Sequence, residues 1–353
     1  MTIPRLRLVE PAFFELSGQT AILRSPLAAT TIKLPIRHLP AFVEDPSSLS
    51  PADQDRLKEE GWLSTQKQPQ ANRVIHPWSS WGDIAWLFHS YTSKTAFISR
   101  KKPEQIAHWV DTLSRATVPE PTRIEKLKDS PCVTPMRREF DIPNATLARV
   151  LNDRRSHRDF TGSPANIHHL SLLLHYGFGP VRYTDSLEVG NLEMRAPLSG
   201  GSIHETSAIV IATSVVGLSS GVYVYDQRRH ALARISENAI SADLESMIYD
   251  QGFTEFSSFS IISISDAGKL SWKYRDARAY RILFMNAGCV AQVLGMVSEA
   301  IGLGMALTAA IDEDKVAQLF PIQAGREFPM FLFSFGDPQK RPDGLPINFR
   351  DPR

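Results

Sequence analysis

The sequence is poor in cysteine and has no excess of either charge. Its 353 residues include two cysteines, Cys132 and Cys289, which are far apart and form no C-x-x-C pair. This spacing predicts neither a disulfide framework nor a zinc knuckle. The 39 lysines and arginines almost balance the 38 aspartates and glutamates, so the chain lacks the positive field that favours binding to nucleic acid.

Sequence signals of several common site types are also missing. There is no G-x-x-x-x-G-K-[ST], no G-x-S-x-G and no H-E-x-x-H. The GLG at 302–304 follows a predicted helix, so it is no dinucleotide fingerprint. His168 and His169 are adjacent, and neighbouring positions on a helix do not face one metal ion. Kinase, hydrolase and metalloenzyme functions are therefore disfavoured, and no metal site is predicted.

The opening stretch MTIPRLRLVEPAFFEL has no continuous apolar core like that of a signal peptide, and we expect a cytoplasmic, reducing location. The apolar run at 289–310 is long enough to raise a membrane span, but it contains Gln292, Ser298 and Glu299. Apolar residues there recur at steps of three and four, as on one face of a helix. They are Leu283, Ala287, Val290, Leu294, Val297 and Ile301. A buried core or dimer helix is therefore favoured.

Residues 1–70 form a small predicted unit. The stretch at 20–36 mixes β-branched residues with breakers and predicts a hairpin. Ser50 as a cap, Pro51 just inside and Gly61 near the end predict a short helix after it. A hairpin followed by such a helix is compatible with a winged-helix-like domain.

A different composition follows in residues 71–143. Helices are predicted near 81–93 and 103–116. Five prolines then fall between 115 and 143, and proline removes backbone donors and fixes φ. We therefore expect a helical and proline-rich connector.

The remainder, residues 144–353, mixes helices with strands that are not consecutive. One helix is predicted to start at a capping Asn144 and another to end at the glycines near 179. Stretches rich in Val, Ile and Tyr predict strands, including a hairpin that turns at DQRRH. The expected strands are at 206–216, 221–236, 257–266 and 327–338, with a long helix from Asp276. This order predicts an α+β layer structure rather than a repeating βαβ fold.

The stretch NDRRSHRDF, residues 152–160, carries the strongest local signal for a ligand. Arg154, Arg155 and Arg158, with the hydroxyl of Ser156, are able to surround one phosphate, because guanidinium groups pair bidentately with its oxygens. The other interpretation is a solvated basic helix end, which the helix dipole favours. Spacing alone does not separate these interpretations.

The same stretch resembles the opening motif of the FMN-binding nitroreductase superfamily, and the chain is most similar to its SagB-type branch. That branch includes the azoline (thiazoline and oxazoline) dehydrogenases of thiazole/oxazole-modified peptides. Four further stretches carry the resemblance in the same order. They are PLSGGSIHE (197–205), GVYVYDQRRHAL (221–232), KYRDARAYRILFMNAGCVAQ (273–292) and AIGLGMALTAAIDED (300–314).

This resemblance implies a nitroreductase-like domain over residues 144–353, with a central helix and an antiparallel or mixed sheet, and a homodimer that holds FMN at its interface. It places the backbone of Ser199, Gly200, Gly201 and Ser202 along the flavin ring, where glycine allows close approach. It places backbone N–H groups of Thr308, Ala309 and Ala310 at the flavin edge, and Arg341 at the phosphate. The acidic residue of relatives would align near Ser207, with Glu205 close by.

A Lys-Tyr pair ahead of R-A-Y-R marks the catalytic position in azoline dehydrogenases, and here it is Lys273 and Tyr274. Oxidation of an azoline ring removes a hydride, which a flavin accepts, and a proton, which needs a base. A phenol is a poor base at neutral pH, so we expect the Lys273 ammonium to lower the pKa of Tyr274. Adjacent side chains diverge on a helix or strand, so convergence of the two requires a loop at 273–274.

The resemblance also suggests partners. Relatives often carry or recruit a winged-helix-like unit that captures a leader peptide by strand addition. Residues 1–70 are expected either to act as such a clamp or to dock a cyclodehydratase. The leading function is FMN-dependent oxidation of azolines in a peptide substrate. The alternatives are an NAD(P)H-dependent flavin reductase of nitro, quinone or dehydroamino-acid groups, and a non-catalytic peptide-binding scaffold.

Overall fold

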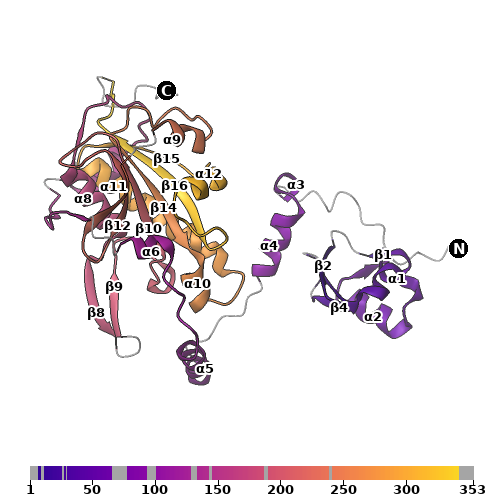
Figure 1. Cartoon of the computed structure of the whole chain (residues 1–353). Coiled ribbons are helices and arrows are strands. Elements are labelled where there is room, and N and C mark those ends of the chain that lie inside the picture. Colours follow the sequence, from indigo (N-terminus) through magenta and orange to yellow (C-terminus); the bar gives the residue numbers. More distant parts are fainter. Residues whose placement is uncertain are drawn as a thin grey trace. The chain divides into compact units, whose positions relative to one another are not determined.

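A computed structural model describes most of the chain. The described residues are 7–8, 12–25, 28, 30–65, 78–93, 101–128, 133–142, 145–186, 190–237 and 241–341. They divide into two compact units (Figure 1). The smaller unit comprises Met1–Lys102 with Asp276–Arg278, and the larger unit comprises Pro103–Arg275 with Ala279–Arg353.

The smaller unit is built on a three-stranded antiparallel sheet in the order β2-β3-β4. Its strands are β2 (Phe13–Ser17), β3 (Thr20–Arg24) and β4 (Ile32–Pro35), and β1 (Arg7–Leu8) pairs with β5 (Leu63–Ser64). Its α-helices are α1 (Leu39–Glu44), α2 (Pro51–Glu59), α3 (Trp78–Trp81) and α4 (Asp83–Ser93). Its core includes Ala21, Leu23, Phe42, Leu57 and Trp62.

Local sequence signals in this unit are confirmed. The predicted hairpin is the β3–β4 pair. The side chain of Ser50 accepts the backbone N–H of Asp53 and caps α2, with Pro51 at its first position. A hydroxyl cap satisfies a donor that the helix leaves free, and proline lacks such a donor, which fixes where this helix begins. The winged-helix-like assignment itself stays a prediction.

The larger unit contains a seven-stranded sheet in which every described pairing is antiparallel, in the order β15-β16-β14-β10-β12-β13-β6. These strands are β6 (Val133–Pro135), β10 (Thr206–Ala212), β12 (Gly221–Asp226), β13 (Ala231–Ser236), β14 (Phe259–Asp266), β15 (Gly304–Thr308) and β16 (Glu327–Gly336). The smaller pairs are β7 (Ala165–Asn166) with β11 (Val215–Val216), and β8 (Arg182–Ser186) with β9 (Gly190–Met194).

Helices cover both faces of this sheet (Figure 1), and successive residues of β10 show why. Ala208 and Val210 join a core with α8 and α11, whereas Ile209 and Ile211 join a core with α6, α9 and α12. Side chains alternate along a strand, so a strand that is apolar on both faces needs two covering layers. The helices are α5 (Pro103–Ser114), α6 (Arg123–Leu127), α7 (Leu147–Asp153), α8 (Ile167–Phe178), α9 (Ser241–Met247), α10 (Ala267–Lys273), α11 (Ala279–Ala300) and α12 (Glu313–Leu319).

Helix α11 is the one helix of the described residues that is long and apolar enough to cross a membrane. It packs against α8 and the sheet, and its buried face includes Leu283, Ala287, Val290, Leu294 and Val297. The apolar stripe read from the sequence is therefore a buried helix face, as expected. The end of this helix that holds Leu283 also holds the candidate site.

Three local expectations differ from the structure. Thr146, rather than Asn144, caps α7, and Asn144 lies outside the described residues. Pro103–Arg275 belongs to the larger unit, so part of the expected connector is incorporated there: β6 extends the sheet, and Ile124 of α6 is fully buried. The β8–β9 hairpin was not expected.

A buried histidine links α8 to the β12–β13 hairpin. His230 is 1% exposed, its Nε2 lies 2.7 Å from Ser171 Oγ, and its Nδ1 lies 2.9 Å from Tyr225 Oη. Burial, with smaller effects from His175 and Arg138, lowers the pKa of His230 to about 4. The imidazole is therefore neutral in the folded protein at neutral pH.

The free energy of unfolding is expected to fall as the pH drops from about 6.5 to about 4, because the unfolded chain binds a proton at His230 that the folded chain does not. Replacement His230→Gln should remove up to one proton from this dependence, or about 1.4 kcal/mol per pH unit. Urea unfolding of both proteins across this pH range measures the slope. Equal slopes would show that His230 is not held neutral.

Candidate functional site

A glycine loop between β9 and β10 lies at the centre of the candidate site. Gly201 has φ 65°, and Ser202 (φ 53°) and His204 (φ 49°) also have left-handed backbones. A Cβ at Gly200 would lie 2.6 Å from Ile282 Cγ2 on α11. Real Cβ atoms do not approach so closely, so glycine is required for this loop to lie against the helix.

The predicted catalytic pair meets the same loop. Lys273 is the last residue of α10, and Tyr274 follows with extended backbone (φ −113°, ψ 98°). The Lys273 Nζ donates a hydrogen bond of 2.8 Å to the Gly201 oxygen. A Cβ at Gly201 would lie 2.9 Å from that Nζ and would overlap the Tyr274 hydroxyl. The break in helix geometry after Lys273 thus lets both side chains converge, as the sequence analysis required.

The start of α10 is fixed by a charged pair. The Asp266 carboxylate accepts the backbone N–H groups of Gly268 and Lys269, and it also accepts two hydrogen bonds from Arg326, of 2.8 and 2.9 Å. A carboxylate at a helix N-terminus is favourable, and a bidentate arginine fixes its orientation. Because α10 has only seven residues, fixing its start also orients Lys273 at its end.

The electrostatics of the pair differ from the expectation. Burial raises the pKa of Tyr274 and lowers the pKa of Lys273. The prediction that the ammonium lowers the phenol's pKa is therefore wrong, since removal from water dominates for both groups. Relative to the free side chains, both shifts favour the uncharged forms, a phenol and an amine. The Lys273 Nζ lies 5.7 Å from the ring centroid of Trp109.

The arginine run lies after α7, beside the far end of α11. A Cβ at Gly295 would lie 3.2 Å from Arg154 Cδ. Arg155 Nη1 donates to the oxygens of Asn152 and Arg154 at 2.8 Å each, so part of its guanidinium completes the helix end, as the alternative interpretation expected. Ser156 and Arg158 are exposed.

The chain after β16 brings further cations to this run. The Thr161 N–H donates to the Asp337 oxygen and the Gln339 N–H donates to the Asp159 oxygen, both at 2.9 Å. Lys340 and Arg341 follow directly. Burial, and then the charges of Lys340, Arg154 and Arg155, lower the pKa of His157 to about 4. Several cationic side chains therefore lie close together, as a site that binds an anion requires. The sequence analysis did not identify Lys340, because it lies in no recognisable motif.

The end of β15 carries the third predicted group. Thr308 is buried, and its hydroxyl accepts the Ala310 N–H at 3.0 Å and the Gln251 side-chain amide at 3.0 Å. Ala309 and Ala310 are exposed. The Ala310 N–H thus has a partner within the chain, which leaves its predicted role at a flavin edge as a prediction.

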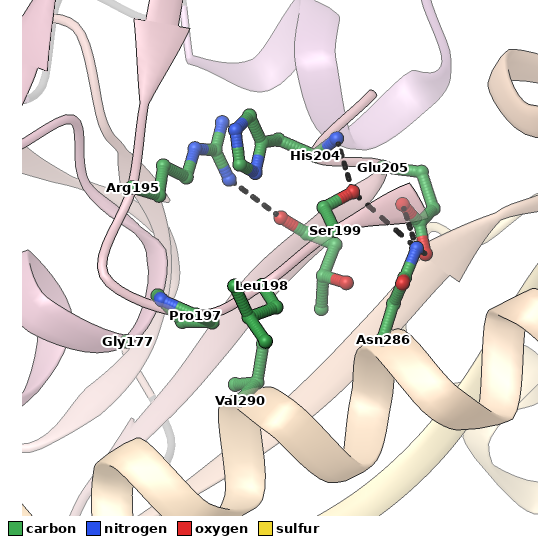
Figure 2. Close-up of a pocket in the computed structure, with 10 residues that line it drawn as sticks. Gly177, Arg195, Pro197, Leu198, Ser199, His204, Glu205, Asn286 and Val290 are labelled. Atoms are coloured by element: carbon green, nitrogen blue, oxygen red, sulfur yellow. Dashed lines mark hydrogen bonds between the residues drawn. The ribbon is translucent and has the colours of Figure 1, made fainter. Parts of the chain in front are cut away.

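A small pocket that is partly open to solvent adjoins the glycine loop (Figure 2). Ser199, Asn286, Glu205, Arg195 and Leu198 are among its lining residues. Arg195 has a side chain only 5% exposed and pairs with Glu193. Asn286 was missed in the sequence, although it stands as a polar residue within the apolar face of α11. No cluster of His, Cys, Asp or Glu in the described part of the chain is able to hold a metal ion.

Helix α11 connects the two ends of the site. It meets the glycine loop at Asn286 and the arginine run at Gly295, nine residues later, which corresponds to about 14 Å along the helix axis. Two glycines that provide close backbone approach lie at one end, and a group of cations lies at the other. These features fit a flavin mononucleotide, which has a flat ring and a phosphate separated by a sugar-alcohol chain.

A model of the nitroreductase family matches residues 151–337. This span is more than half of the chain and includes the glycine loop, the Lys-Tyr pair, α11 and the arginine run. The chain therefore belongs to the nitroreductase family. Proteins of this family are flavin-dependent oxidoreductases that bind FMN.

Three curated proteins are similar to this chain over part of its length. MJ1384 of Methanocaldococcus jannaschii, which is named as a nitroreductase, is 28% identical over 56% of this chain and 93% of its own length. The trifolitoxin operon protein TfxC of Rhizobium leguminosarum bv. trifolii is 23% identical over 62% of this chain and 63% of its own length. The trifolitoxin-processing protein TfxB of the same organism is 23% identical over 46% of this chain and 45% of its own length. The chain thus spans about half to two thirds of the trifolitoxin proteins.

Two solved structures are also similar to this chain. A chain of the microcin synthetase McbBCD complex from E. coli, bound to truncated pro-MccB17, is 20% identical, covers 65% of this chain and 87% of that chain, and has a TM-score of 0.44. A nitroreductase-type protein from Desulfovibrio desulfuricans in complex with FMN is 15% identical, covers 59% of this chain and 94% of that chain, and has a TM-score of 0.39.

Replacement Gly201→Ala should destabilise the larger unit by about 2–4 kcal/mol, because it adds a clash with Lys273 and Tyr274 to the cost of a left-handed backbone. Gly302→Ala is the matched control: its φ is +79°, and a Cβ there would meet nothing within 4 Å. It should cost only the backbone strain, about 1 kcal/mol. Urea unfolding gives both values. Equal losses would mean that the loop and the pair are not in contact.

Proposed function

We propose that this chain is an FMN-dependent dehydrogenase that oxidises thiazoline or oxazoline rings of a peptide-derived substrate to thiazoles or oxazoles. The observation that carries the proposal is the convergence of Lys273 and Tyr274 on Gly201 of the glycine loop. A flavin reductase supplied by a nicotinamide needs no protein base, whereas aromatisation of an azoline does.

The cationic end of the site would hold the phosphate, through Arg154, Arg155 and Arg158 with Lys340 or Arg341 nearby. The backbone of residues 199–202 would lie along the ring. When bound, FMN supplies the hydride acceptor, and oxygen would restore its oxidised form. The substrate ring loses two hydrogens in total, one as hydride and one as a proton, and gains one double bond.

Lys273 is the group that we assign to the proton. Burial lowers its pKa, so the neutral amine is more accessible than in a free lysine. In that form it would donate one N–H to the Gly201 oxygen and accept a proton from a ring carbon. Tyr274, whose pKa is raised, acts as a neutral phenol that donates a hydrogen bond and orients the ring. This division of roles replaces the expected phenolate base.

A second copy of the chain is the proposed partner of α11. Tyr280, Phe284 and Met285 are 47%, 54% and 66% exposed on that helix. Exposed large apolar side chains on one helix favour an interface. A homodimer would cover them and would place a second subunit beside the site.

The smaller unit is the proposed peptide-binding element. The family model matches residues 151–337, so residues 1–102 of the smaller unit lie outside that match. Strand β2 lies at the edge of its sheet, and Phe14 and Leu16 are 44% and 63% exposed. An edge strand with exposed apolar side chains is suited to strand addition by a peptide. The trifolitoxin-processing protein among the relatives supports a role beside other peptide-modifying enzymes.

Replacements Lys273→Ala and Tyr274→Phe should each lower azoline oxidation at least about a hundredfold while FMN stays bound. The first removes the proton acceptor and the second removes the hydrogen bond that orients the substrate ring. In the unchanged protein the rate should rise with pH through the lowered pKa of Lys273, since only the neutral amine accepts a proton. Mass spectrometry of a thiazoline peptide, which loses two hydrogens on oxidation, measures the rate.

Lys315→Ala on α12 is the control for loss of a lysine, because Lys315 pairs with Asp312 at the helix start, and it should retain activity. Full conversion by the Lys273→Ala protein would refute the assignment of the base.

A further inference from the structure

Asn286 is buried on α11 and uses both ends of its amide. Its Oδ1 accepts the Gly200 N–H at 3.0 Å. Its Nδ2 donates to both oxygens of Glu205, at 3.0 and 3.1 Å (Figure 2). A backbone N–H is only a donor, so the amide oxygen must face Gly200 and the NH₂ must face Glu205. The orientation of this side chain is therefore fixed by its two partners.

Glu205 has little access to water, being 1% exposed. Burial raises its pKa, and the hydrogen bond from Asn286 opposes the rise. A buried carboxyl group is costly unless it is hydrogen-bonded. Glu205 nevertheless lies in the pocket wall, and both of its oxygens accept hydrogen bonds from the Asn286 amide. This arrangement indicates that the Glu205–Asn286 pair has a role that two apolar side chains would not perform.

The loop that this pair contacts is unfavourable by itself. Ser202 and His204 are non-glycine residues with left-handed backbones, and such conformations persist only where neighbours enforce them. Three hydrogen bonds hold the loop: Gly200 N–H to Asn286, His204 N–H to Ser199 Oγ at 3.0 Å, and Ser202 N–H to the Ser199 oxygen at 3.1 Å. Ser199 Oγ also lies 3.3 Å from Asn286 Nδ2. The first two hydrogen bonds thus involve the Asn286 amide or its neighbour Ser199 Oγ.

The same loop carries the Gly201 oxygen that accepts Lys273 Nζ. One continuous series of hydrogen bonds therefore runs from Glu205 through Asn286 and the loop to Lys273. A shift of the loop at Gly200 moves the acceptor of Lys273 as well.

We propose that Glu205 and Asn286 are positioning residues, which hold the glycine loop in the form that receives the flavin ring and that places Lys273 beside it. This inference rests on the proposed FMN site. The pair acts through its donor and acceptor pattern, so exchanging donor and acceptor between the two positions should preserve it.

The test is a reciprocal exchange. Asn286→Asp keeps an acceptor for Gly200 but sets two carboxyl groups against each other, and Glu205→Gln leaves a buried NH₂ group facing the Asn286 NH₂. Each single replacement should weaken FMN binding about tenfold, the equivalent of one hydrogen bond. In the double variant N286D/E205Q, the new carboxylate at position 286 accepts the Gly200 N–H and also accepts an N–H from the new amide at position 205. Its FMN affinity should therefore return to within about threefold of that of the original protein.

Three readouts separate positioning from general damage. FMN titration of the flavin-free protein, followed by flavin fluorescence, gives the dissociation constant. The visible absorption maxima of the bound flavin report its surroundings, and thermal unfolding of the flavin-free protein reports stability. Ser298→Ala is the control: it removes a buried hydrogen bond of α11, from Ser298 to the Leu303 oxygen, and should lower stability without changing affinity or spectrum.

Recovery of FMN affinity, spectrum and stability in the double variant supports the proposal. Single variants that bind FMN as tightly as the original protein overturn it, and so does a double variant whose losses equal the sum of the two single losses or that fails to fold. If the original protein binds no FMN, the proposed function fails first and this inference with it. The two failures are thereby distinguished.

Discussion

The site depends on one steric constraint, the close approach of a glycine loop to α11 on one side and to Lys273 and Tyr274 on the other. A single added methyl group at Gly200 or Gly201 would overlap a neighbour. The loop's own backbone is unfavourable, so its form is set by the elements around it. Asn286, Lys273 and the partly buried side chain of Ile282 are the neighbours that the loop meets.

The fold explains why those elements are available. A sheet that is apolar on both faces needs two helical layers, and α11 belongs to one of them by its buried stripe. The same helix reaches from the loop to the arginine run, so one rigid element sets the distance between the two ends of the site. Asp266 and Arg326 fix the short helix that carries Lys273, and the chain after β16 returns to complete the cationic end.

Sequence reasoning succeeded where a local pattern is sufficient. Ser50 caps the helix that it was expected to cap, β10 forms in a stretch whose Val and Ile content predicts a strand, and the stripe of α11 is buried as its periodicity predicts. It failed where tertiary context decides. Strand β6 lies in a proline-rich segment and is stabilised by pairing with β13. The pKa of Tyr274 is raised by burial, and burial of this side chain depends on the tertiary structure rather than on the local sequence. Asn286 interrupts an apolar stripe, a signal that attention to apolar positions alone overlooks.

The central claim is that proton removal by Lys273 accompanies hydride loss from an azoline at this loop. The most direct measurement is anaerobic mixing of the purified, FMN-loaded protein with a thiazoline peptide or with NADPH, followed by flavin absorbance and by the mass of the peptide. The account predicts bleaching by the peptide alone, with loss of two hydrogens from it. Rapid bleaching by NADPH with an unchanged peptide would contradict the account and identify a flavin reductase.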